Sequence, residues 1–380
     1  MSSSPFVRTA GTHISGARTL PGEYYHSPAI LEREIEQLFR ERWLWAGRVE
    51  RVAKPGDYFL YERFGESVIV LRDRAGVLRA FYNVCRHRGT RMCELKSGSL
   101  GSSIQCPYHA WTYGLDGRLL GAPHMQDVEG FDKADFPLHP APVQEWEGFI
   151  FISLSQDPVP FEQAFAPVLN RFERFNLGKL VVVGRQEYDV AANWKLIMQN
   201  YNECLHCPTI HPELSKVLPY QSGANDLHAG EQLGGYMELT AGNASATTDG
   251  TACGVPIGAL SDEDTRRAFY YTFFPNMMLS VHPDYVNYYS VWPVDERHSI
   301  VKTEWLQHPS SVSSGHYSPK GAIEFWDTVN RQDWHICERS QLGVESRAHQ
   351  PGPFSPLESI PAAWDRSYLT SMRSQGQDIT

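Results

Sequence analysis

The sequence lacks several features that would place it in a specialised class of protein. It has no apolar run long enough to span a membrane and no stretch rich in lysine and arginine. Its 380 residues carry a formal net charge of −10, which disfavours a nucleic-acid-binding face. Residues 1–11 contain no apolar segment of the kind found in secretory signals. We therefore expect a cytoplasmic protein that binds neither nucleic acid nor membrane.

The chain also lacks two common electron-transfer fingerprints. It contains no G-x-G-x-x-G dinucleotide motif and no C-x4-C-x2-C ferredoxin set. Electrons from NAD(P)H would therefore have to reach it only indirectly, through a separate reductase. Its 7 cysteines, in a reducing compartment, are expected to be metal ligands or free thiols rather than a disulfide frame.

What is present is the composition of an ordinary globular protein, with 42% hydrophobic and 21% charged residues. Turn residues and apolar periodicity predict an N-terminal arm and helix over 1–44, an all-β domain over 45–160, and an α+β domain over 165–380. Helices are predicted over 28–43, 161–175, 194–205 and 323–342. Predicted strands include 57–63, 67–72, 78–84, 149–154, 180–188 and 270–274.

The all-β domain contains the pattern C-x-H…C-x2-H, formed by Cys85, His87, Cys106 and His109. Each of two short loops offers one thiolate and one imidazole, which is the ligand set of a [2Fe–2S] cluster with two cysteines on one iron and two histidines on the other. A Cys2His2 zinc site uses the same residue types. Zinc fingers, however, pair like with like along the chain, so the arrangement favours the cluster.

The α+β domain contains a second ligand pattern, E-x2-H-x4-H, formed by Glu203, His206 and His211. Two residues five apart do not share a face of a regular α-helix, but Pro208 is expected to kink or widen the helix there. Both imidazoles could then reach one metal ion. Two histidines and one carboxylate form the facial triad of non-heme Fe(II) oxygenases. A zinc site that also uses Cys204 and Cys207 is the alternative.

These motifs resemble those of the large subunit of Rieske non-heme iron oxygenases. The likeness extends to the residues around both cysteine–histidine pairs and to Asn193-Trp194-Lys195 before the second pattern. It implies a Rieske domain followed by a catalytic domain with an antiparallel sheet and helices, similar to START/SRPBCC folds. It also implies a Rieske [2Fe–2S] cluster and a mononuclear Fe(II).

The resemblance further implies roles for individual residues. Asp333 would be the third iron ligand, with Asp327 and Glu338 as the alternatives. Glu203 and Asn200 would be catalytic. Glu203 would accept a hydrogen bond from His206 and another from cluster ligand His109 of a neighbouring subunit in a homo-oligomer, expected to be a trimer. The expected partner is a flavin- and iron–sulfur-containing reductase, and O₂ is the expected co-substrate.

The substrate class is less constrained by the sequence. The spacing of residues 200–203, the segment 204–207 and the segment 274–286 resemble oxygenases of quaternary ammonium compounds such as glycine betaine, choline, carnitine or stachydrine. A trimethylammonium group is held by aromatic faces, and a planar aromatic acid would suit the same lining. A non-catalytic Rieske electron carrier is a third hypothesis. The candidate aromatic residues are Tyr201, Tyr270, Tyr271, Phe273, Tyr285, Tyr288, Tyr289 and Trp292.

Overall fold

The computed structural model describes residues 6–227 and 231–373. The chain divides into two compact units. One, here called the β unit, is Phe39–Phe161. The other, the α+β unit, combines Met1–Leu38 with Glu162–Thr380, so the described part of the N-terminal arm groups with the later part of the chain. In the described segments, no helix is both long and apolar enough to cross a membrane.

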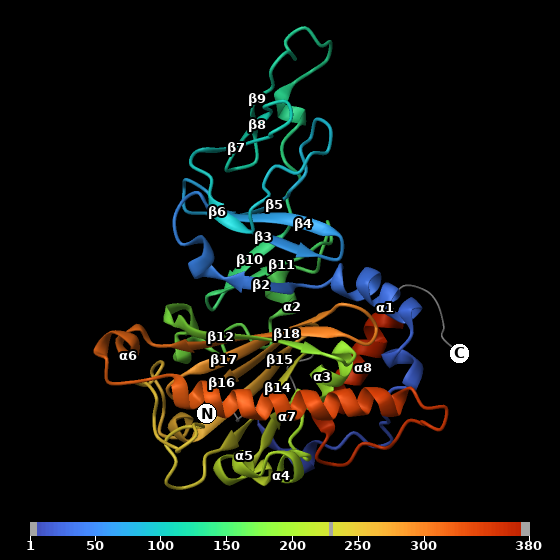
Figure 1. The fold of residues 1–380 in the computed structure, drawn as a ribbon, viewed down its shortest axis with the longest axis vertical. Coiled ribbons are helices and arrows are strands. Elements are labelled where there is room, and N and C mark those ends of the chain that lie inside the picture. Colours follow the sequence, from blue (N-terminus) through green and yellow to red (C-terminus); the bar gives the residue numbers. More distant parts are fainter. Residues whose placement is uncertain (1–5, 228–230, 374–380) are drawn as a thin grey trace. The chain divides into compact units, whose positions relative to one another are not determined.

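The β unit contains three small antiparallel sheets, in the strand orders β5-β4-β3-β6, β10-β11-β2 and β7-β8-β9 (Figure 1). The central strands β4 and β11 are rich in β-branched and aromatic residues, and glycine-containing turns separate many of the strands. The strands are β2 (Leu44–Arg48), β3 (Asp57–Arg63), β4 (Glu66–Arg72), β5 (Leu78–Tyr82), β6 (Ser97–Ser99), β7 (Ser103–Gln105), β8 (Thr112–Gly114), β9 (Leu119–Gly121), β10 (Val143–Trp146) and β11 (Phe149–Ile152).

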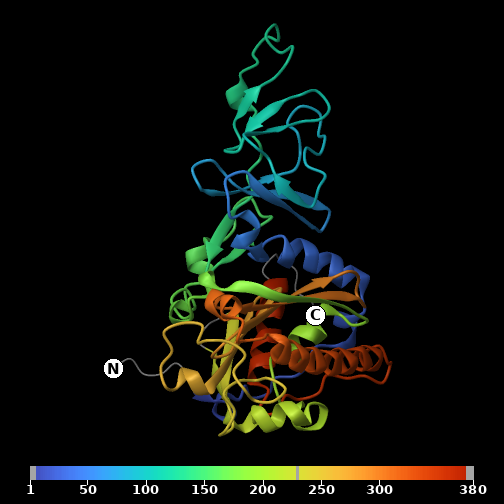
Figure 2. The ribbon, with the colours of Figure 1, turned by 60° about the vertical axis from the view of Figure 1, so that its left-hand side comes forward.

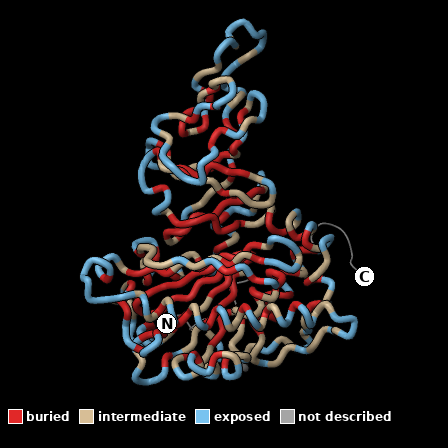
Figure 3. The backbone as a smooth tube through the Cα atoms, in the orientation of Figure 1, coloured by how far each residue is buried: buried red, intermediate tan, exposed pale blue. Residues whose placement is uncertain are grey.

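The α+β unit is built on one antiparallel sheet with the strand order β1-β13-β14-β15-β16-β17-β18-β12. Its central strands are buried along nearly their whole length, which explains their continuous apolar and aromatic sequence (Figure 3). The strands are β1 (Val7–Arg8), β12 (Val181–Val190), β13 (Ala224–Asp226), β14 (Gln232–Glu238), β15 (Arg267–Phe273), β16 (Met277–Val281), β17 (Val286–Pro293) and β18 (Ser299–Gln307).

Helix α7 is the longest helix described and runs across this sheet, in contact with α3 and β12 (Figures 1 and 2). Helix α8 contacts α3 and β14. The α-helices are α1 (Pro28–Glu34), α2 (Phe161–Ala164), α3 (Trp194–Tyr201), α4 (Cys207–Ile210), α5 (Pro212–Val217), α6 (Pro309–Ser314), α7 (Lys320–Val344) and α8 (Ser359–Arg373). Helix α3 therefore lies between the sheet and two long helices, which fixes the segment that follows it.

Three predicted helices are shorter than expected, and the one predicted over 194–205 ends at Tyr201. The helix predicted over 28–43 is α-helical only as far as Glu34 and continues as a π-helix, Ile35–Phe39. The helix predicted over 161–175 ends at Ala164 and continues as turns. Pro167 explains this early end, because it disfavours helical geometry at the residue before it and cannot donate a backbone hydrogen bond.

Candidate active site

The two cysteine–histidine loops of the β unit have the same backbone geometry. In each loop the cysteine N–H donates to the carbonyl five residues later, and the cysteine carbonyl accepts from the N–H four residues later. These bonds join Cys85 with Thr90 (2.9 Å) and Gly89 (3.0 Å), and Cys106 with Trp111 (2.8 Å) and Ala110 (3.1 Å). The residue four positions on has a positive φ in both loops, 75° at Gly89 and 56° at Ala110. Two equivalent loops present two equivalent pairs of ligands.

The side chains of these loops converge. The rings of His87 and His109 lie with centroids 4.7 Å apart, and His87 stacks on Trp111 at 4.9 Å. Both thiols are buried, whereas His87 is exposed and His109 is half-buried. Burial, with the Cys106 thiol nearby, raises the pKa of Cys85. These two thiols and two imidazoles suit a cluster that is covered on its cysteine side and accessible on its histidine side.

In the α+β unit, His206 and His211 point the same ring nitrogen toward one carboxylate. Nε2 of His206 lies 3.2 Å from Oδ1 of Asp333, and Nε2 of His211 lies 2.8 Å from the same oxygen. Potential ligand atoms of these three residues all lie within 4.8 Å of one another. A cluster of two imidazoles and one carboxylate fits a non-heme iron with open positions.

The other ring nitrogen of each histidine is held by a hydrogen-bond acceptor. Nδ1 of His206 donates to Oε1 of Glu203 at 2.6 Å, and Nδ1 of His211 donates to Oε1 of Gln332 at 2.6 Å. Each ring is thereby fixed in the tautomer that leaves Nε2 available to a metal. Burial opposes a charge on His206, but hydrogen bonds to Asp333 and Glu203 outweigh it and raise its pKa to about 10. The site therefore favours positive charge at this point.

The two alternative carboxylates lie in other hydrogen-bond networks. Asp327 accepts from the hydroxyl of Tyr188 at 2.8 Å, and Glu338 accepts from the backbone N–H of Ala191 at 3.2 Å. Of the three carboxylates considered, Asp333 is the one beside both histidines. All three lie on α7, but Asp327 and Glu338 share one face and Asp333 lies on another, so the helix geometry separates Asp333 from both.

The backbone between the histidines differs from the expected single kinked helix. Helix α3 ends at Tyr201, α4 begins after His206, and His211 separates α4 from α5. Pro208 and Pro212 stand in the first turns of α4 and α5, where a missing N–H costs nothing. Pro208 therefore starts a new helix instead of bending an existing one, and three short helices bring the imidazoles together.

The expectation of free thiols is wrong for two cysteines. Cys204 and Cys207 form a disulfide, because the turn between α3 and α4 brings their Cα atoms to 5.0 Å. The bond also removes their sulfurs from the alternative zinc set. The five remaining cysteines, Cys85, Cys93, Cys106, Cys253 and Cys337, are free and buried.

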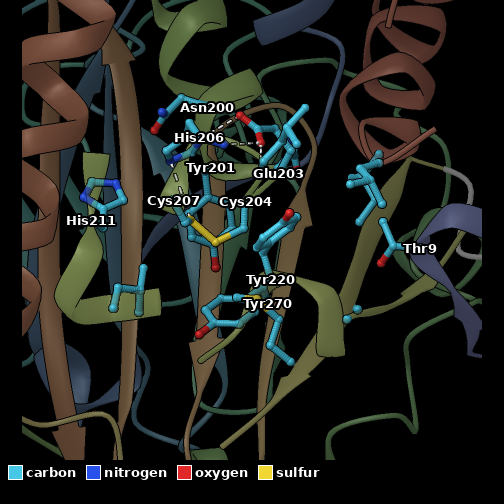
Figure 4. A pocket seen from close by; sticks show the side chains of 18 of the residues that line it. Thr9, Asn200, Tyr201, Glu203, Cys204, His206, Cys207, His211, Tyr220 and Tyr270 are labelled. Carbon is cyan, nitrogen blue, oxygen red and sulfur yellow. Dashed lines mark hydrogen bonds and ion pairs between the residues drawn. A yellow bond between two sulfur atoms is a disulfide. The ribbon is translucent and has the colours of Figure 1, made fainter. Parts of the chain in front are cut away.

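A pocket opens beside His206, His211 and Asp333 (Figure 4). Glu203 and Asn200 line it, and Asn200 lies next to His206 in this view. Of the predicted aromatic residues, Tyr201 and Tyr270 line the pocket. The other candidates are buried in the core instead.

Sequence reasoning missed several lining residues, among them Thr9, Tyr220, Asn225 and Trp326. A signal existed for Trp326, since it lies seven positions before Asp333 and two helical turns place both on one face of α7. No comparable signal existed for Thr9 and Asn225, which reach the pocket through the pairing of β1 with β13.

Family models match both parts of the chain. Residues 42–132 match the Rieske [2Fe-2S] domain, and residues 177–374 match the catalytic domain of the ring hydroxylating alpha subunit. The chain belongs to the Rieske non-heme iron oxygenases. Its cofactors are therefore a Rieske [2Fe–2S] cluster and a mononuclear iron, as predicted, and as an oxygenase subunit it depends on a separate reductase.

Related Rieske oxygenases are similar over most of the chain. The glycine betaine monooxygenase oxygenase subunit of Pseudomonas aeruginosa is 30% identical, over 89% of this chain and 85% of the relative. The carnitine monooxygenase oxygenase subunit of Escherichia coli is also 30% identical, over 88% and 86%. The structure of the quaternary ammonium Rieske monooxygenase CntA superposes with a TM-score of 0.78 at 26% identity, covering 96% of this chain and 97% of that one. The predicted fold class is confirmed.

Proposed function

We propose that this protein is a terminal oxygenase that hydroxylates or N-demethylates a quaternary ammonium compound. His206, His211 and Asp333 would hold the mononuclear iron, which supplies the open coordination positions for O₂. The cluster would be held by Cys85, His87, Cys106 and His109. The supporting observation is the paired orientation of His206 and His211, whose Nδ1 atoms are held by acceptors while their Nε2 atoms face Asp333.

Glu203 is proposed to have two functions. It holds the imidazole of His206, and it would couple the iron site to His109 of a neighbouring copy in a cyclic trimer. Its carboxylate is 14% exposed, so it remains accessible. Asn200, which lines the pocket beside His206, is also proposed to be a catalytic residue. The reductase is proposed to be a flavin and iron–sulfur protein supplied with NAD(P)H in the cytoplasm.

Two observations support a quaternary ammonium substrate. The relatives that are similar over most of the chain are named as glycine betaine and carnitine monooxygenase subunits. The pocket is also lined by the aromatic rings of Tyr201, Tyr270 and Trp326, which can hold a trimethylammonium group by cation–π attraction. An aromatic acid remains the alternative substrate.

The test is substrate-dependent O₂ uptake by the iron-loaded protein with a surrogate reductase, across trimethylammonium compounds and aromatic acids. Uptake with trimethylammonium compounds, with formaldehyde release where N-demethylation occurs, is expected. Uptake with aromatic acids alone would contradict the proposed substrate class. Metal analysis gives an independent check, because a catalytic subunit binds the two cluster irons and one more, whereas a carrier binds the cluster alone.

A further inference from the structure

The pocket has two chemically different regions. His206, His211 and Asp333 form the metal-binding region, and Thr9 lies on the opposite side of the pocket from His211 (Figure 4). The residues that line the pocket, all within the described part of the chain, include no lysine and no arginine. Away from the metal-binding region, an anionic group in the pocket would therefore have no cationic side chain against it.

The region around Thr9 is polar but uncharged. Oγ1 of Thr9 donates to Oδ1 of Asn225 at 3.1 Å. The amide nitrogen of Asn225 donates to Ser359 at 2.9 Å and to Thr12 at 3.1 Å. The two amide hydrogens of Asn225 are thus used by neutral hydroxyl oxygens. This network cannot neutralise an anion, although it tolerates a neutral polar group.

Two arginines near this region already have acidic partners. The guanidinium of Arg267 lies 4.1 Å from the ring centroid of Tyr236 and pairs with Glu263 at 2.7 Å. Arg171 pairs with the buried carboxylate of Asp226 at 2.5 Å. Neither arginine lines the pocket.

The strand register explains why these charges stay outside the pocket. Successive residues of a strand point to opposite faces of the sheet. Arg267 therefore points to the face opposite Tyr270, and Asp226 points to the face opposite Asn225. Arg267, and Asp226 with its partner Arg171, therefore belong to the other face of the sheet.

Tyr270 contributes an aromatic ring to the pocket. The hydroxyl of Tyr270 is buried and has no hydrogen-bond partner among the described residues. Its ring lies with centroid distances of 6.3 Å to Tyr201 and 6.5 Å to Trp326, which also line the pocket. The hydroxyl oxygen itself is inaccessible, so Tyr270 offers the pocket its ring and not a hydrogen bond.

We infer that the pocket selects quaternary ammonium compounds whose other end is an uncharged polar group, such as an alcohol, over those that end in a carboxylate. The inference rests on the proposed function. The aromatic rings would hold the ammonium group of both classes. A buried carboxylate without a cation loses its hydration and gains no ion pair, whereas a hydroxyl needs only one neutral hydrogen bond. Oγ1 of Thr9, which gives its own proton to Asn225, can accept that bond.

The test compares pairs of trimethylammonium compounds that differ only in whether the other end is an alcohol or a carboxylate. Choline is paired with glycine betaine, and (4-hydroxybutyl)trimethylammonium with γ-butyrobetaine. The dissociation constant of each compound and kcat/KM with a surrogate reductase are measured on the wild-type protein. We expect the alcohol of at least one pair to be preferred by about tenfold or more in both quantities. Equal or better binding and turnover of the carboxylates in both pairs would overturn the inference but not the proposed function.

A matched pair of variants tests the same point from the protein side. Thr9→Lys places a cation at the uncharged region, and Thr9→Met adds a side chain of similar length without charge. The ratio of carboxylate to alcohol turnover should be about tenfold higher in Thr9→Lys than in Thr9→Met. An unchanged ratio would overturn the assignment of this region to the substrate's far end. Turnover of aromatic acids alone, with no trimethylammonium compound accepted, would instead overturn the proposed function itself.

Discussion

Nε2 of His211 lies 2.8 Å from Oδ1 of Asp333, although 122 positions separate the two residues in the chain. His211 directly follows the four-residue helix α4, and Asp333 lies in the second half of α7. Nε2 of His206 lies 3.2 Å from the same oxygen. Two segments that are far apart in the chain therefore meet around one point that suits a metal ion.

Replacing Asp333 with alanine should remove the mononuclear iron and leave the cluster in place. Loss of one of the three proposed ligands should weaken metal binding, while the proposed cluster loops lie in a different unit of the chain. Metal analysis should show one iron fewer per chain, with the visible absorbance of the cluster unchanged. Asp327→Ala is the control, because this carboxylate lies on the same helix but contacts Tyr188 instead. Equal iron loss in both variants would remove Asp333 from the ligand set.

Glu203→Gln should keep both metal centres and lose nearly all turnover. The amide can still accept the hydrogen bond from His206, but the charge that orients and polarises this imidazole is gone. We expect steady-state O₂ uptake to fall by about 100-fold. Glu213→Gln, on the exposed surface of α5, should have wild-type activity. Wild-type product formation by Glu203→Gln would exclude a functional role for this carboxylate.

Glu34→Gln should destabilise the α+β unit strongly. Oε1 of Glu34 accepts from Nζ of Lys195 at 2.6 Å, Oε2 accepts from Trp194, and both charged side chains are fully buried. Removing one charge leaves the other buried without an ion partner, which costs about 3–5 kcal/mol. Chemical denaturation would measure the free energy of unfolding, with the exposed Glu32→Gln of the same helix as control. The double variant Glu34→Gln, Lys195→Met should be less destabilised than Glu34→Gln.

The stability of the protein should depend on Asp365 between pH 5 and 8. Burial raises the pKa of this carboxyl to about 7, despite a hydrogen bond from Gln199 and the nearby charge of Lys195. The folded state therefore keeps a proton that the unfolded chain releases near pH ~4. Stabilisation by this proton is lost as the pH rises toward 7.

Asp365→Asn should abolish that part of the pH dependence. The free energy of unfolding, from urea denaturation at pH 5 and pH 8, should fall by about 2–3 kcal/mol more in the wild type than in the variant. Both proteins share all other titrating groups, so the difference reports Asp365. Parallel pH profiles would show that the carboxyl ionises normally in the folded state.

The disulfide between Cys204 and Cys207 predicts a defined thiol count. Alkylation of protein unfolded without reductant should modify the five cysteines that are free in the structure. Prior reduction should raise the count to 7. Modification of all cysteines without reduction would mean that the bond does not form in the isolated protein.

The metal ligand types and their local spacing could be predicted from the sequence. The two cysteine–histidine loops and the pair His206 and His211 are each encoded within a few residues of chain. Backbone preferences act over the same short range, so strands such as Asp57–Arg63 were also predictable. Helices were less predictable where a proline starts a new helix, as Pro208 does.

Local pattern did not determine the disulfide or the composition of the pocket. Cys204 and Cys207 are joined because a turn interrupts the expected helix, and Thr9 meets Asn225 because β1 pairs with β13. Which carboxylate of α7 faces the two histidines depends on how that helix is rotated against the sheet. Sequence thus determined the chemical groups, whereas tertiary packing decided which of them meet, because contacts across more than 100 residues depend on the whole fold.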